Sequence, residues 1–235
     1  MSGYEKDKHY NWQESMILMR SACMGIGIIS TKIRYTFEKK VNFQKLRVDQ
    51  MNGLKDSKIP MEQKLFEDFF IRKDIAKMIF NQSKKNFDDY IDKSRLIVFD
   101  TFCELTDKKF KHRLTDYTFC AHNSDIKRSP IFDQEFEELG LIPVDEIYEG
   151  FDRFFSTNYK NLKNKSIYIF HYSDKYEKRE LYIKRNREIQ EIMMSFKNIG
   201  LDIKNCVPSS NKVKNIDSYP YHFSKETLLH LASKM

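Results

Sequence analysis

The stretch Arg95-Leu-Ile-Val-Phe-Asp100 decides the fold that this sequence predicts. Apolar residues follow one another in it without a polar break, and an acidic residue ends the run. Such a run has no side that could face solvent, which is typical of a strand buried on both faces of a parallel sheet. The run at 166–172 (Ser-Ile-Tyr-Ile-Phe-His-Tyr) has a similar pattern. We therefore expect 96–100 and 167–172 to be central, almost fully buried strands.

The segments around these runs alternate between strand and helix patterns. Apolar residues at helical spacing predict helices over 60–85, 143–162, 176–197 and 225–233. Further apolar runs predict strands at 15–20, 115–121 and 201–207. Ser129-Pro130 also opens a helix, whereas 21–27 fits either a turn into a helix or a second strand. Alternating strands and helices imply βαβ units, so the predicted fold class is α/β, a three-layer α/β/α sandwich with a mainly parallel sheet.

The composition favours one compact domain over residues 1–235. Apolar residues make up 40 % of the chain and aromatic residues 14 %, whereas disordered chains have few of either. Only 7 Gly and 5 Pro are present, which leaves little material for flexible linkers. The first residues are charged and polar, and we expect about 14 of them to be flexible.

The net charge of +7 leaves two interpretations open. The basic residues could form a solvated surface, or they could attract a polyanion such as nucleic acid, an acidic glycan or an anionic membrane face. They are spread along the chain with no run of five like charges. No known nucleic-acid-binding motif occurs, so nucleic acid is the partner we expect least.

The cysteines and the N-terminus point to the cytoplasm. Cys23, Cys103, Cys120 and Cys206 form no CxxC pair and have no zinc-ligand spacing, so we expect reduced thiols and no metal. No secretory signal leads the chain. The longest apolar stretch, 16–30, contains an arginine and is too short to span a membrane.

The clearest candidate for catalysis is the loop before the last helix. Ligands of parallel α/β folds bind beyond the carboxyl ends of the strands. His222 in this loop could act as a general base there, and Asp217 could orient it. Alternatively, His222 could only bond backbone within an aromatic corner. Ser21 is the candidate nucleophile, and Cys23 is its rival if Arg20 stabilises the thiolate.

Two further polar groups follow predicted strands and are candidate binding residues. Asp100 and Glu104 could share a proton, hold a metal or take part in acid–base chemistry, or they could cap the next element or bind a surface lysine. His122 and Ser124 form either a turn or part of a site. Gly25-Ile-Gly27 lacks the third glycine of a dinucleotide fingerprint and no phosphate-binding loop occurs, so no cofactor is expected.

Four short pieces of the chain match a known pattern. They are Arg20-Ser21 with Ile29-Ser30, Asp49, Leu96-Ile-Val-Phe-Asp100 followed by Glu104, and Pro220-Tyr-His222-Phe. On these pieces the chain resembles a bacterial family that is related to the SGNH hydrolases and found beside capsule and lipopolysaccharide genes. The resemblance spans residues 15 to 230, and His222 is similar to the family's C-terminal histidine.

The resemblance implies an SGNH/flavodoxin-like fold. In active members a serine near the N-terminus attacks and the C-terminal histidine activates it, which hydrolyses or transfers acyl groups on sugars. This chain lacks the Gly-Ser-Cys turn that holds the family's nucleophile, and its Asp217 and His222 are five residues apart instead of three. The chain is then either an esterase or O-acyltransferase, or a catalytically inactive binding protein of polysaccharide biosynthesis. The implied partners are a glycan or activated-sugar substrate and an acyl donor.

Overall fold

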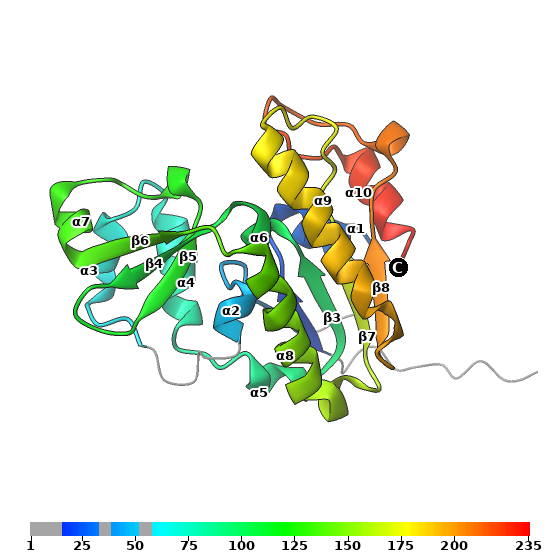
Figure 1. The fold of residues 1–235 in the computed structure, drawn as a ribbon, viewed down its shortest axis with the longest axis horizontal. Coiled ribbons are helices and arrows are strands. Elements are labelled where there is room, and N and C mark those ends of the chain that lie inside the picture. Colours follow the sequence, from blue (N-terminus) through cyan, green and yellow to red (C-terminus); the bar gives the residue numbers. More distant parts are fainter. Residues whose placement is uncertain (1–15, 33–38, 52–57) are drawn as a thin grey trace, which may run out of the picture.

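The computed structural model describes residues 16–32, 39–51 and 58–235 and shows an α/β fold with two sheets (Figure 1). The larger sheet has five parallel strands, with helices on both faces. This three-layer α/β/α arrangement is the fold class that the sequence predicts. The expectation of a flexible N-terminus falls on residues outside the described part of the chain.

The strands of the parallel sheet follow the order β2 (Lys39–Asn42), β1 (Met16–Arg20), β3 (Ser94–Asp100), β7 (Ser166–Phe170) and β8 (Asp202–Cys206). In the central strand β3, Ile97 is in register with Leu18 on β1 and with Ile167 on β7. All three side chains are fully buried. The two runs predicted as central strands are confirmed, because each is flanked by strands on both sides and covered on both faces.

Helices cover both faces of this sheet (Figure 1). On one face α8 (Val144–Leu162) packs against α9 (Glu180–Ser195), and on the other α1 (Cys23–Lys32) packs against α10 (Lys225–Ala232). Asp145 and Glu146 in the first turn of α8 complement the positive end of the helix dipole. The buried residues of α8 recur at helical spacing, so the helix predicted at 143–162 is confirmed. The ambiguous segment 21–27 is a turn into α1.

The helix predicted over 60–85 is instead two helices, α3 (Gln63–Asp68) and α4 (Lys73–Gln82). The break lies at 69–72, where the backbone pairs with a distant segment. Ile71 donates its N–H to the carbonyl oxygen of Asp125, and the carbonyl oxygen of Phe69 accepts from Lys127. The prediction was wrong here because tertiary hydrogen bonds replaced those of a continuous helix.

The second sheet is antiparallel, in the order β5 (Thr118–Ala121), β4 (Lys108–His112) and β6 (Phe136–Gly140). The strand predicted at 115–121 is β5, so it does not join the parallel sheet; β4 and β6 were not predicted. These strands pack with α3, α4 and α7 (Pro130–Glu135) around a core of their own. α7 begins at the predicted Ser129-Pro130, where Ser129 Oγ accepts from the N–H of Phe132.

Short elements complete the described chain: α2 (Val48–Met51), α5 (Asp88–Ile91), α6 (Phe102–Thr106) and the 3-10 turns η3 (Asn123–Asp125), η4 (Phe196–Asn198) and η5 (Ser210–Lys212). Among the described residues, no helix combines the length and apolar content that crossing a bilayer requires. All four cysteines are free thiols. Cys103 and Cys120 are buried, and burial raises the pKa of both thiols.

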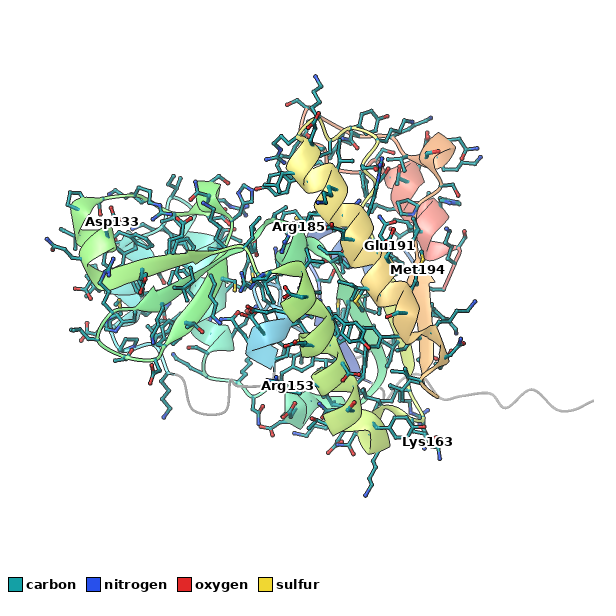
Figure 2. The ribbon with its side chains drawn as sticks, viewed as in Figure 1. Asp133, Arg153, Lys163, Arg185, Glu191 and Met194 are labelled. Atoms are coloured by element: carbon teal, nitrogen blue, oxygen red, sulfur yellow. The ribbon has the colours of Figure 1, made fainter. Side chains whose placement is uncertain are left out.

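Buried arginines join the two sheets. Arg185 reaches from α9 toward the region where the sheets meet (Figure 2) and donates to the carbonyl oxygen of Ile142 at 2.6 Å. Arg47 donates to the carbonyl oxygens of Asp107 and Gly140, which lie at the two ends of the small-sheet segment. Because both side chains bond backbone on the connections, they hold the small sheet in place beside the carboxyl ends of the parallel strands.

Candidate functional site

A cleft of about 280 Å³ lies between the two sheets. One wall comes from segments that follow the parallel strands and from the 207–224 loop: Ala22, Cys23, Gln44, Lys45, Phe102, Tyr172, Tyr219, Tyr221 and His222. The opposite wall comes from the small sheet and its helices: Arg72, Ile75, His122, Ser124 and Asp125. The cleft therefore lies at the carboxyl edge of the parallel sheet, where the sequence placed the site.

His222 lines this cleft and is hydrogen-bonded to Asp217. The Nδ1 atom of His222 lies 2.7 Å from Oδ2 of Asp217, and Oδ1 of the same carboxylate accepts from the N–H of Tyr219 at 2.8 Å. The hydrogen bond with His222 holds the pKa of Asp217 below its usual value. A carboxylate at Nδ1 keeps the proton on that nitrogen, which leaves the Nε2 lone pair available to accept a proton.

Backbone hydrogen bonds bring Asp217 and His222 together although they are five residues apart in the sequence. Ile216 donates to the carbonyl oxygen of His222, and Asn215 and Phe223 form a bridge that closes the loop. The closed turn thereby brings the side chains of Asp217 and His222 together. The expected contact between Asp217 and His222 is present; their catalytic roles remain a prediction.

Aromatic rings form the wall beside His222. The Tyr219 ring centroid lies 4.7 Å from that of His222 and 5.6 Å from that of Tyr221. Tyr221 packs edge-on against Tyr172, and its hydroxyl donates to Glu177 at 2.6 Å. These contacts tie the 217–222 loop to the segments that connect β7 with α9, so the loop that presents His222 has a packed support.

His122 and Ser124 lie on the opposite wall. His122 follows β5 and caps η3, with its Nδ1 accepting from the backbone N–H of Ser124 at 3.2 Å. The Ser124 hydroxyl oxygen lies 2.7 Å from the same nitrogen. Burial lowers the pKa of His122. The residues thus form both the turn and part of the cleft wall, the two alternatives that the sequence left open.

Ser21 is buried, is not part of the cleft lining, and is bonded to Asp100. Its Oγ donates to Oδ2 of Asp100 at 2.6 Å, and the same carboxylate accepts from the N–H groups of Ala22 and Phe102. Burial raises the pKa of Asp100 to about 6. Within the described chain, no hydrogen bond joins Ser21 to His222. The expected pairing of Ser21 with His222 is therefore absent, because the serine fastens the turn after β1 to the end of β3.

Glu104 serves a separate buried ion pair. Its Oε1 accepts from Nη1 of Arg20 at 2.5 Å and from the N–H of Val48 at 2.9 Å. The carboxylates of Asp100 and Glu104 therefore accept from different donors, and Oε2 of Glu104 is buried without a hydrogen-bond partner among the described residues. Across the described residues, no group of three or more His, Cys, Asp or Glu side chains is placed to hold a metal ion. The two carboxylates hold the ends of β1 and β3 in place. This is a structural role, which the sequence left open as the alternative to a functional one.

The sequence did not predict the buried charged residues of the cleft lining, Lys45 and Asp125, or their neighbour Asp107. Lys45 is buried, with its Nζ 3.1 Å from Asp107 and 3.4 Å from Asp125. Burial alone would lower the pKa of Lys45, but the two carboxylates outweigh it and raise that pKa. Lys45 follows no recognisable motif, and its partners lie far along the chain, so only the folded chain brings the three together.

Comparison with protein-family models and with curated proteins finds no match for this chain. The resemblance to the SGNH-related family is therefore carried by the quoted motifs alone.

Proposed function

We propose that this chain is a hydrolase or acyltransferase that acts on acyl esters of surface polysaccharide or its precursors, with His222 as the general base. The observation that supports this most directly is the 2.7 Å contact between His222 and Asp217 at the wall of the cleft. A histidine whose Nδ1 is held by a carboxylate is the usual device for taking a proton from a hydroxyl near neutral pH.

In the proposed reaction the attacking hydroxyl belongs to water or to an acceptor sugar. His222 Nε2 takes its proton as the oxygen attacks the ester carbonyl, and the carbonyl becomes a tetrahedral oxyanion. When the C–O bond to the leaving alcohol breaks, the imidazolium returns the proton to that oxygen. Direct attack suits the buried position of Ser21, which would have to leave Asp100 in order to act as nucleophile.

The aromatic wall supports a sugar as the substrate. Tyr172, Tyr219 and Tyr221 line the cleft together with the polar residues Gln44 and Arg72. Pockets that combine apolar rings with a few polar groups hold ligands of mixed character and fix their orientation. A pyranose with an ester substituent has this mixed character.

The second candidate is a sugar-binding protein without catalytic activity. The burial of Ser21 favours it, since the serine that follows the first strand and is the candidate nucleophile is buried and bonded to Asp100. The aromatic wall supports sugar binding equally in either case. The two candidates differ in one measurable property, which is whether an ester bond is broken.

The test is hydrolysis of p-nitrophenyl acetate and of glucose pentaacetate by the wild-type chain and three variants. His222→Ala should lose roughly a hundred- to ten-thousand-fold in rate, the usual cost of removing a general base. His230→Ala, a histidine of α10 outside the cleft lining, is the matched control and should retain activity. Ser21→Ala tests the nucleophile, because a loss as large as that of His222→Ala would assign the attack to Ser21.

The proposal fails if the folded wild-type chain hydrolyses neither probe. It also fails if His222→Ala is as active as His230→Ala. Binding of a sugar without hydrolysis, measured by calorimetry, would establish the second candidate instead.

A further inference from the structure

Two histidines face the same cleft from opposite walls. His222 belongs to the loop before α10, and His122 follows β5 of the small sheet. The Tyr219 ring is near both of them, with its centroid 4.7 Å from that of His222 and 6.5 Å from that of His122. One substrate bound in the cleft can therefore meet both imidazoles.

The hydrogen bonds fix opposite tautomers for the two rings. A backbone N–H can only donate, so the Nδ1 of His122, which accepts from Ser124 N–H, carries a lone pair and the ring proton is on Nε2. A carboxylate can only accept, so Nδ1 of His222 carries the proton and Nε2 carries the lone pair. The cleft thus has an acceptor nitrogen on one wall and a donor nitrogen on the other.

We propose that His122 is a second catalytic residue, whose Nε2–H donates a hydrogen bond to the carbonyl oxygen of the ester. This inference rests on the proposed function. As His222 Nε2 takes the proton from the attacking hydroxyl, the carbonyl π electrons move onto the oxygen that His122 faces. The oxyanion is stabilised by this bond until the C–O bond of the leaving alcohol breaks and His222 returns its proton.

The surroundings of His122 suit a donor that stays neutral. Burial lowers the pKa of this histidine, so the ring is uncharged at neutral pH. The charges that act on it include both signs, from Asp107, Asp125, Lys45 and Arg179, and partly cancel. Within the described chain its Nε2 has no hydrogen-bond partner, since the contacts of the ring to Ser124 use Nδ1 only. A histidine that served only as a cap would need no more than Nδ1.

The experiment compares His122→Ala and His122→Gln with the wild type on p-nitrophenyl acetate. Removing one oxyanion donor costs roughly a hundred- to a thousand-fold in kcat, and we expect a loss of that size in His122→Ala with a smaller change in KM. Gln supplies a side-chain N–H at similar reach, so His122→Gln should recover part of the lost kcat. His230→Ala is the control, and circular dichroism checks that each variant is folded.

Long-range ¹H–¹⁵N NMR of the ring nitrogens adds a measurement that needs no activity. At neutral pH, His122 should show a protonated Nε2 and an unprotonated Nδ1. The opposite tautomer would overturn the inference, and so would a His122→Ala variant as active as wild type while His222→Ala is inactive; both results leave the proposed function standing. A wild-type chain that hydrolyses no ester would overturn the proposed function and, with it, this role of His122.

Discussion

Replacing Glu104 with Gln removes the charged partner of a buried arginine. The side chains of Arg20 and Glu104 are 1 % and 0 % exposed, and Nη1 lies 2.5 Å from Oε1. Arg20 also donates to the carbonyl oxygens of Leu46 and Asp100, which keep its hydrogen bonds but supply no countercharge. The variant therefore isolates the charge of Glu104, because Gln has nearly the same shape.

The expected cost follows from the burial of the pair. Removing one partner of a buried ion pair destabilises a protein by roughly 3–5 kcal/mol, since the remaining charge stays desolvated. The side-chain amide of the Glu104→Gln variant keeps an oxygen that can accept from Arg20 and Val48, and the carboxylate of Asp100 remains nearby. We expect the lower end of the range, about 3 kcal/mol, which is a large share of the roughly 5–15 kcal/mol of typical domains.

Urea unfolding followed by circular dichroism measures this loss. With a slope of about 3 kcal/mol per molar urea, a loss of about 3 kcal/mol lowers the midpoint by about 1 M. The matched control is Glu188→Gln, since Glu188 pairs with Lys184 at 3.7 Å on the exposed side of α9. That pair is worth at most about 0.5 kcal/mol. A Glu104→Gln midpoint no lower than that of the control would refute the reasoning.

Three further outcomes are expected. Gly25→Ala should prevent stable folding, because a Cβ at Gly25 would lie 1.8 Å from Oγ of Ser21; a variant that melts like wild type contradicts the close packing of α1 on that turn. In the native protein a maleimide should label Cys23 alone, since it is the one exposed thiol of the four, whereas mass spectrometry after denaturation should find four labels. The pKa of Asp100 is raised by burial to about 6, above its unfolded value, so its stabilising contribution is complete below about pH 4 and is lost as pH rises through 6. Relative to Asp100→Asn, the wild type should lose about 3 kcal/mol between about pH 4 and pH 7 in urea unfolding, and a pH-independent difference would contradict this.

The sequence alone determined four of the five strands of the parallel sheet and most of the helices beside them, whereas the edge strand β2 was not predicted. The stretch from Leu96 to Asp100 has no polar residue in its interior, and no arrangement other than burial on both faces satisfies it. Helical spacing and the proline at its start located α8 in the same way. These signals are local, because period and capping are properties of neighbouring residues. The sheet edge that holds the cleft followed from them, since loops after parallel strands share one edge.

Only the tertiary structure decided which side chains line the cleft at that edge. The antiparallel sheet was not predicted in full, because β4 and β6 carry lysines and glutamates and are strands through pairing with each other. Ser21 does not line the cleft because its hydroxyl donates a hydrogen bond to Asp100, which lies far along the chain. His122 and His222 line the same cleft because the small sheet is fixed against the carboxyl ends of the parallel strands. Contacts between residues far apart in the chain leave no periodic trace in the sequence, and these contacts set the chemistry of the cleft.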